Sequence, residues 1–193
     1  MQADDSESDE VIMLRVREGQ IDQLSTLYKR YRTPLFNFFL RLTSERHLSE
    51  DLVQDVFFRI MKYRHSYRPR HSFRTWMYQI ARNVRIQAWS HAAREPVMSA
   101  VQEQDNLPTA DENSARPDTQ VILGQDLDQL KQSISRLPEA SREVLILSRY
   151  QDLKYDEIAS ILQCSVGAVK MRVLRSMNEL RQQFEYLSRK EVS

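Results

Sequence analysis

The chain has 193 residues, 41% hydrophobic and 28% charged, with a formal net charge of +1, which is the balance of a folded, soluble protein and not of a disordered chain. Its single cysteine, Cys164, excludes an internal disulfide and any multi-cysteine metal site. No apolar run approaches the ~20 residues of a membrane span, and the acidic N-terminus is the reverse of a signal peptide, so we expect no membrane insertion and a cytoplasmic protein.

Helices dominate the first part of the chain. Three glycines and six prolines are too few for a turn-rich fold, so an all-α fold is predicted. Apolar residues spaced by three or four predict a helix over 24–42, which Pro34 should kink or break. Ser49 is expected to cap the next helix. Four residues on the polar face of that helix are candidates for contact with a partner protein: Asp51, Gln54, Asp55 and Phe58. Local packing of Phe58 remains the alternative.

A basic, aromatic block follows. Residues 56–94 hold nine Arg or Lys, three His and eight aromatic residues, and no acid. This composition fits a polyanionic partner, although a solvated helix face would look similar. Residues 64–72 form a basic loop with Tyr67, Arg68 and His71. On the helix that follows, Trp76 is expected in the core, and four residues lie off the buried stripe: Arg74, Gln79, Arg82 and Asn83.

Residues 95–121 break the helical pattern. Residues 95–119 carry six acids against one base, with three prolines among polar residues. The segment is therefore predicted to be a flexible acidic linker between two small helical domains, over 8–94 and 122–188.

The second domain is predicted to contain a helix-turn-helix. A helix over Tyr155–Leu162, a turn over Gln163–Ser165 and a last helix from Val166 form this arrangement, with Ser165 as N-cap. The spacing of the last helix predicts a buried stripe of Val166, Val169, Val173, Met177, Leu180 and Phe184. The opposite face would direct Lys170 and Arg175 toward a DNA major groove. An ordinary pair of helices with surface lysines is the alternative.

Three segments carry a resemblance to a known family. "RLPEASREVLILSRYQDLKYDEIASILQCSVGAVKMRVLRSMNELR" resembles the C-terminal domain of the extracytoplasmic-function (ECF, group 4) sigma factors of the sigma-70 family, and "SEDLVQDVFFRIMKY" and "FRTWMYQIARN" resemble their N-terminal domain. The resemblance covers about 10–94 and 122–185. Gln163 stands where the family often has glycine, Met171 where Ser is common, and Gln87 where Asp is common.

The resemblance implies roles for particular residues. The helix with Asp51, Gln54, Asp55 and Phe58 would dock on core RNA polymerase, as part of a sigma-2-like domain. The −10 promoter element would be read and melted by the basic loop and the helix after it, through Tyr67, Arg68, His71, Arg74, Gln79, Arg82 and Asn83. The −35 element would be read by a sigma-4-like domain through Ser165, Val166, Gly167, Lys170, Met171, Leu174 and Arg175. The acidic linker would thread through the polymerase, with a plain tether as the alternative.

We therefore interpret the chain as an alternative sigma factor that confers promoter specificity on core RNA polymerase and promotes promoter opening. The resemblance implies a stress or envelope response under the control of an anti-sigma factor. The sequence predicts no enzyme, no cofactor and no metal site, because it lacks phosphate-cradling glycine loops, nucleophile motifs and metal-ligand spacings. Two other functions fit the pattern: an operator-binding regulator, and a helical adaptor that binds a protein through the Asp51 face.

Overall fold

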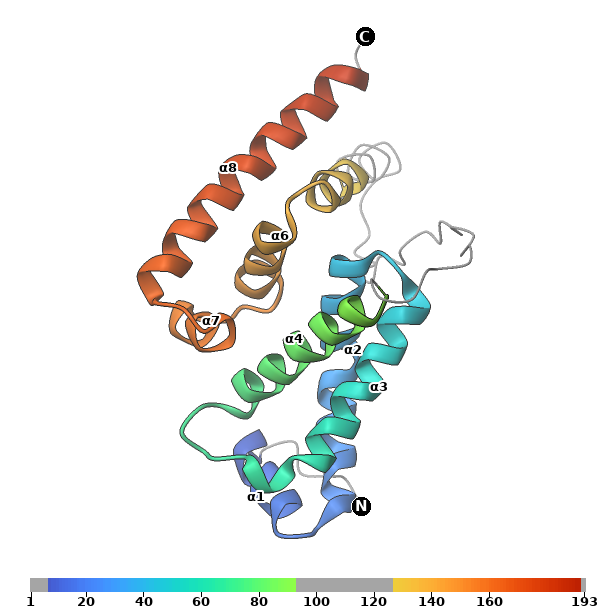
Figure 1. Cartoon of the computed structure of the whole chain (residues 1–193), viewed down its shortest axis with the longest axis vertical. Coiled ribbons are helices and arrows are strands. Elements are labelled where there is room, and N and C mark those ends of the chain that lie inside the picture. Colours follow the sequence, from blue (N-terminus) through green and yellow to red (C-terminus); the bar gives the residue numbers. More distant parts are fainter. Residues whose placement is uncertain (1–6, 93–126, 192–193) are drawn as a thin grey trace, which may run out of the picture.

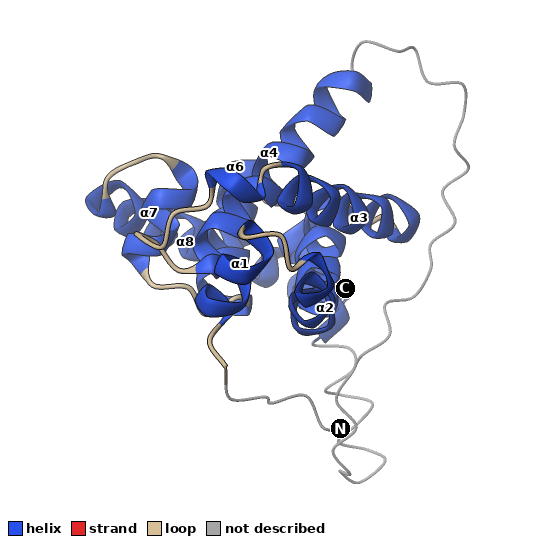
Figure 2. Ribbon diagram, turned by 90° about the horizontal axis from the view of Figure 1, so that it is seen from below, coloured by secondary structure: helices blue, strands red, loops and turns tan. Residues whose placement is uncertain are grey.

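The computed structural model describes residues 7–92 and 127–191, and the regular elements in these ranges are all helical (Figures 1 and 2). The predicted linker, residues 95–121, lies outside the described residues. The N-terminal elements are α1 (Asp9–Arg17), η1 (Ile21–Gln23), α2 (Leu24–Thr43), α3 (Arg46–Lys62), η2 (Arg64–Ser66) and α4 (Phe73–Ala92). The C-terminal elements are a helical segment at 127–135, α6 (Glu139–Leu145), a π-helical turn (Ile146–Tyr150), α7 (Tyr155–Leu162) and α8 (Val166–Glu191). The all-α prediction is confirmed.

The N-terminal group packs α2, α3 and α4 side by side, with α1 against the ends of α2 and α4. Leu27, Leu35 and Phe38 of α2 are fully buried, as are Val56 and Ile60 of α3. This burial fixes the rotation of α3 about its own axis. The polar face of α3 is consequently turned outward.

Pro34 does not break α2, which is continuous over Leu24–Thr43 with Pro34 inside it, and a kink at Pro34 stays a prediction. The predicted N-cap of the next helix is wrong. α3 begins at Arg46, three residues before Ser49, so Ser49 is not its N-cap. The Ser49 side chain is buried, and its hydroxyl donates to the Glu45 carbonyl oxygen at 2.6 Å, which is the bond that a serine makes inside a helix.

The C-terminal group packs α6 and α7 against the long helix α8. Val144 and Ile146 are fully buried, together with Ile158 of α7 and Val169 of α8. α6 continues directly into the segment Ile146–Tyr150, which has π-helical hydrogen bonding.

The two groups also contact each other. α7 packs against α4 (Figure 1). Both α6 and the π-helical turn touch α2. Buried residues of both groups join in one hydrophobic cluster. The sequence predicted two domains on a tether and did not anticipate this contact.

Candidate nucleic-acid and polymerase interfaces

The outward face of α3 carries the four predicted polymerase contacts. Asp51 and Gln54 are exposed, and Phe58 is 56% exposed, so its ring does not pack locally. Asp55 is half-buried, and its carboxylate accepts from the guanidinium of Arg59. The exposed ring of Phe58 is the feature of this face that is typical of a protein contact.

The basic loop holds Tyr67 in an unexpected place. Its side chain is fully buried, with ring centroids 5.1 Å from Trp76 and 6.3 Å from Phe73. Its hydroxyl has no hydrogen-bond partner. Burial raises the pKa of Tyr67 to about 12, with a further contribution from the negative charges of Glu10 and Asp9. In this conformation the Tyr67 ring packs beneath the loop against Trp76 and Phe73, and it is not accessible to a nucleic-acid base.

Residues 65, 66 and 68–71 of the loop are exposed to solvent. Arg68 and His71 are exposed, and Arg68 Nη1 donates to the carbonyl oxygens of His65 at 2.8 Å and Tyr67 at 3.1 Å. These bonds hold the Arg68 guanidinium against the loop backbone. His71 lies two residues before α4 begins.

The four predicted residues of α4 differ in their surroundings. Asn83 is exposed and Arg74 is half-buried. Gln79 and Arg82 are also half-buried, but they bond to the C-terminal group: Gln79 Nε2 donates to the Ser160 carbonyl oxygen at 3.1 Å, and Arg82 Nε lies 3.4 Å from a carboxylate oxygen of Glu143. α4 therefore presents a basic face that the C-terminal group partly covers.

The helix-turn-helix forms as predicted, with a turn over 163–165. Gln163 ends α7 in the left-handed conformation, with φ 53° and ψ 48°. A residue without Cβ adopts this conformation without strain, so the glycine common here in the family has a physical reason. Ser165 caps α8, because its Oγ accepts from the backbone N–H of Ala168 at 3.1 Å.

α8 presents the predicted reading face to solvent. Lys170 and Arg175 are exposed, and so are Gly167, Met171 and Leu174 between and beside them. Ser165 and Val166 are exposed at the start of the helix. The seven residues predicted for the −35 element thus lie on one accessible surface.

The buried stripe of α8 differs from the predicted one. Val169 and Val173 are buried, but Val166 and Met177 are 39% and 38% exposed. Ser176 takes the buried position expected for Met177, and Leu180 and Phe184 are half-buried. Val166 is exposed because it is the first residue of the helix, beside the open turn. The prediction assigned buried positions from apolar residues alone, so it placed Met177 in the stripe where the buried residue is Ser176.

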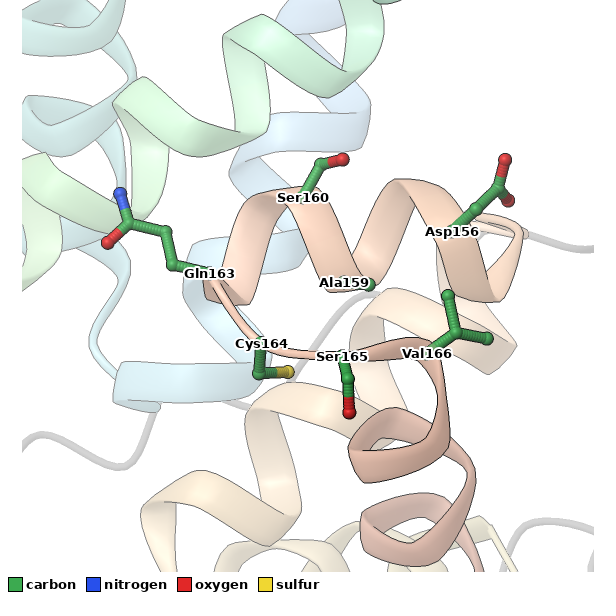
Figure 3. Close-up of a pocket in the computed structure, with 7 residues that line it drawn as sticks. All are labelled: Asp156, Ala159, Ser160, Gln163, Cys164, Ser165 and Val166. Carbon is green, nitrogen blue, oxygen red and sulfur yellow. The ribbon is translucent and has the colours of Figure 1, made fainter.

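A shallow depression lies beside the turn (Figure 3). It is lined by Asp156, Ala159, Ser160, Gln163, Cys164, Ser165 and Val166. Cys164 is a free, half-buried cysteine that packs against the hydrophobic cluster. The depression borders the N-terminal end of the reading face.

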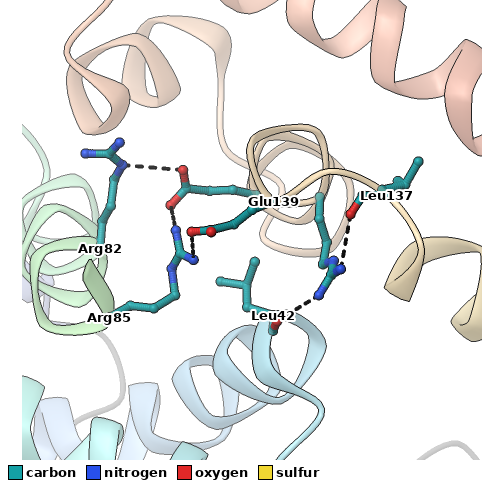
Figure 4. Close-up of polar contacts among 7 residues, drawn as sticks. Leu42, Arg82, Arg85, Leu137 and Glu139 are labelled. Carbon is teal, nitrogen blue, oxygen red and sulfur yellow. Dashed lines mark hydrogen bonds and ion pairs between the residues drawn. The ribbon is translucent and has the colours of Figure 1, made fainter. Parts of the chain in front are cut away.

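Sequence reasoning missed Arg85. This arginine of α4 is 2% exposed and bonds to Glu139 and Glu143 of α6 (Figure 4). Its partners lie more than fifty residues away in the chain. No local pattern distinguishes it from the solvated arginines of the same block. Residues 56–94 contain no Asp or Glu, and this indicates only that any ion-pair partner of their arginines lies in another part of the chain.

Within residues 7–92 and 127–191, no group of three or more His, Cys, Asp or Glu could hold a metal ion. None of the helices in residues 7–92 and 127–191 is long and apolar enough to cross a membrane.

Comparison with known proteins finds one family match in each of the two helical groups. A family model described as sigma-70 region 2 matches residues 27–95, and one described as sigma-70, region 4 matches residues 127–180. The RNA polymerase sigma-H factor of Pseudomonas aeruginosa is 25% identical over 174 residues, which cover 88% of this chain and 90% of that protein. The ECF RNA polymerase sigma-E factor of Escherichia coli K12 is 28% identical over 188 residues, covering 95% of this chain and 97% of that protein.

Solved structures share the fold. The sigma factor RpoE of Bartonella quintana, in complex with the anti-sigma factor NepR, has a TM-score of 0.67 at 23% identity, covering 83% of this chain and 96% of that one. CnrH, in complex with the cytosolic domain of CnrY, has a TM-score of 0.69 at 19% identity, covering 93% and 99%. With both sigma-70 regions matched in order, and relatives aligned over nearly their whole length, this chain belongs to the extracytoplasmic-function sigma factors of the sigma-70 family.

Proposed function

We propose that this sigma factor binds core RNA polymerase, directs it to particular promoters and promotes opening of the DNA duplex. The observation that carries the proposal is the outward face of α8, where Lys170 and Arg175 stand exposed on a helix that Ser165 caps. That geometry fits a helix-turn-helix that reads base edges in the major groove. The matches to sigma-70 regions 2 and 4 support its use at promoters.

Reading of the −35 element rests on α8. Lys170 lies near the N-terminal end of the helix, which is the end that meets base edges in this motif. Arg175 lies about one and a half turns further along, where it reaches a base or a phosphate. Ser165, Val166 and Gly167 bring the start of the helix close to the DNA, while Met171 and Leu174 supply apolar contacts.

Capture of the −10 strand rests on the basic loop and on α4. This surface offers positive charge and base-reading groups from Arg68, His71, Arg74 and Asn83. Residues 56–92 themselves contain no Asp or Glu. Tyr67 contributes by holding the loop against Trp76. Gln79 and Arg82 join this surface when the C-terminal group leaves α4.

Docking on core polymerase rests on α3. The face with Asp51, Gln54, Asp55 and Phe58 combines negative charge with an exposed ring. Charge of this sign steers the helix to a basic partner surface, and the ring adds apolar contact area.

The proposed partners are core RNA polymerase, promoter DNA and an anti-sigma factor. The last is suggested by two related folds, each solved with such a protein or with a cytosolic domain bound to it. We propose no enzymatic activity and no cofactor, and a cytoplasmic site of action, where core polymerase works.

Transcription with purified core polymerase tests the proposal. A library of randomised promoters is transcribed with and without the protein, and the products are sequenced. Specific initiation that needs both components supports a sigma factor. Protection of DNA by the protein alone, with no start sites gained by the polymerase, would instead identify an operator-binding regulator.

A further inference from the structure

The N-terminal helix α1 holds both ends of the segment 67–73, which contains the exposed part of the basic loop. Glu10 Oε1 accepts from the backbone N–H of Phe73, the first residue of α4, at 2.9 Å. Arg17 Nη1 donates to the carbonyl oxygen of Tyr67 at 3.4 Å. Glu10 and Arg17 are about two helical turns apart, or ~10 Å along the axis, so they lie on the same side of α1. One side of one helix therefore bridges the two ends of the loop.

The bond from Glu10 brings a carboxylate to the start of α4. The first N–H groups of a helix have no partners within it, and their partial positive charge favours an anion. Residues 56–94 contain no Asp or Glu, so the loop itself cannot supply a carboxylate. Ser72 Oγ accepts from the Thr75 N–H at 3.2 Å, and Glu10 takes the Phe73 N–H. Glu10 is half-buried, and with Ser72 it completes the cap of α4.

The side chain of Phe73 is also held by α1, through a tyrosine of α2. The Phe73 ring is fully buried, and its centroid lies 5.5 Å from that of Tyr31 in an edge-on contact. The Tyr31 hydroxyl donates to the carboxylate of Asp9. Two neighbouring residues of α1 therefore fix the same residue, Glu10 through its backbone and Asp9 through its ring contact.

At the other end of the segment, the Tyr67 carbonyl oxygen joins α1 to the loop. It accepts from Arg17 Nη1 and, at 3.1 Å, from Arg68 Nη1. A carbonyl oxygen has two lone pairs and can accept both bonds. The Tyr67 ring packs against Trp76, so this residue is held by its backbone and by its side chain. Residues 68–71 are exposed between the two ends.

These bonds lie within the N-terminal group. Glu10, Arg17 and the loop all belong to that group, so the bonds do not depend on where the C-terminal group lies. The match to sigma-70 region 2 begins at residue 27, and α1 ends at Arg17. The helix that holds the loop is therefore outside the residues that the family model matches.

We propose that Glu10 and Arg17 are positioning residues for −10 reading, which hold the ends of the segment 67–73 so that Arg68 and His71 meet the DNA strand in one arrangement. This inference rests on the proposed role of the basic loop in −10 capture. A loop whose ends are already fixed loses less conformational freedom when it binds. Discrimination among bases also depends on supporting contacts that keep the reading groups in place.

The test uses holoenzyme assembled from core polymerase and the full chain of each variant. Two promoter libraries are transcribed, one randomised in the −10 element and one in the −35 element, and the transcripts are sequenced. The test variants are Glu10→Ala, Glu10→Gln and Arg17→Ala. Glu18→Ala and Arg15→Ala are matched controls on or beside the same helix, because Glu18 is exposed and Arg15 pairs with Glu7. Circular dichroism verifies that each variant keeps its helices.

Glu10→Ala is expected to relax the preference at one or more −10 positions about fivefold, with the −35 preference unchanged. Glu10→Gln keeps a side-chain oxygen that accepts from the Phe73 N–H, so it should restore most of the lost preference. Arg17→Ala should relax the same positions by less, because its bond is longer. Both controls should match the wild type. A loss of folded protein lowers the yield from both libraries and changes neither preference, so reduced stability alone does not produce this pattern.

Three results would overturn the positioning role. The first is a wild-type −10 preference in both Glu10→Ala and Arg17→Ala. The second is an equal relaxation at the −35 element, which would show a general effect on the protein. The third is a relaxation that Glu10→Gln does not restore, because the hydrogen bond to Phe73 would then not be what fixes the loop.

Failure of the proposed function gives a different result. In that case the wild-type holoenzyme itself shows no specific initiation, or no preference within the −10 library. A clear −10 preference of the wild type that all the α1 variants share would reject the role of Glu10 and Arg17 alone.

Discussion

Asp55 and Arg59 form a two-pronged ion pair on α3, with Arg59 Nε 3.1 Å and Nη2 2.9 Å from the two carboxylate oxygens of Asp55. The third guanidinium nitrogen of Arg59, Nη1, donates to Gln87 Oε1 of α4 at 2.7 Å. Asp55 therefore has a structural role beside its proposed polymerase contact, since it orients the arginine that links α3 to α4. Asp51, one turn earlier, is exposed and bears no such link.

Reversing the charge of both acids tests the docking face of α3. Asp51→Arg with Asp55→Arg should abolish capture by core polymerase, weakening binding by about 2 kcal/mol or more because both charges reverse on the docking face. The helical circular dichroism should stay unchanged. Glu18→Arg with Asp22→Arg makes the same charge change at two exposed positions away from α3 and should bind normally. Wild-type capture by the Asp51–Asp55 variant would remove α3 as the docking element.

Tyr67 allows a prediction about stability. Its buried hydroxyl has no partner, so Tyr67→Phe should raise the free energy of unfolding by about 1 kcal/mol. Tyr78→Phe is the contrast, because it removes a hydroxyl that is bonded to Gln151 and should lower the same quantity by about 1 kcal/mol. Urea unfolding of both variants measures the difference. Equal destabilisation by the two changes would show that the Tyr67 hydroxyl has an essential partner.

Tyr67 also makes the free energy of unfolding depend on pH in the alkaline range. The pKa of Tyr67 is raised to about 12 in the folded chain, against about 10 when unfolded. A raised pKa means that the unfolded state loses its proton first, so the stability due to Tyr67 is complete below pH 10 and is lost as the pH rises toward 12. Burial raises the pKa of Tyr31 and Tyr78 as well. Tyr67→Phe should therefore show a shallower, but still present, decline of unfolding free energy over this range.

Asn83 is the clearest test of strand capture, because it is exposed on α4 and lies outside the contact with the C-terminal group. In holoenzyme, Asn83→Ala should reduce permanganate reactivity of −10 thymines roughly fivefold, the equivalent of about 1 kcal/mol of a lost base contact. Binding of closed duplex should change less. Ser90→Ala, further along α4, should leave both unchanged, since Ser90 bonds only to the nearby Gln87 carbonyl. A loss of closed binding without a loss of melting would make Asn83 a duplex contact.

The sequence predicted the elements better than their mutual contacts. The helix-turn-helix, the Ser165 cap and the exposure of Lys170 and Arg175 follow from local spacing, because a stripe of apolar residues fixes the rotation of a helix. The burial of Tyr67 under the loop, and of Arg85 at the α4–α6 contact, depends on groups far away in the chain. Such burial has no local signal, since a tyrosine or an arginine in a basic block is usually a surface residue.

The turn of the helix-turn-helix gives a stability prediction. Gln163 is left-handed at φ 53°, so Gln163→Gly should stabilise the C-terminal group by about 1 kcal/mol. Gln163→Ala keeps a Cβ and should bring no gain. Thermal unfolding of the full chain compares the two variants. A stabilised alanine variant would indicate that the glutamine side chain, and not the backbone conformation, is the unfavourable element.

The reading face of α8 gives the most specific prediction, because burial of Val169, Val173 and Ser176 fixes its rotation independently of any DNA. Lys170→Ala should cost about 1–3 kcal/mol at preferred promoters and relax preference at one or two −35 positions. Arg175→Ala should relax preference at a different position if it meets a base, or weaken all promoters equally and reduce the salt slope by about 1 if it meets a phosphate.

A randomised −35 library, transcribed at two salt concentrations by holoenzyme with each variant, measures both effects. Arg181→Ala is the control, because Arg181 is exposed further along α8 and pairs with Glu185. It should leave sequence preference unchanged. Because the buried side of α8 is fixed by packing, no other rotation of the helix could expose a different reader. An unchanged preference for both Lys170→Ala and Arg175→Ala would therefore show that this helix does not read the −35 element.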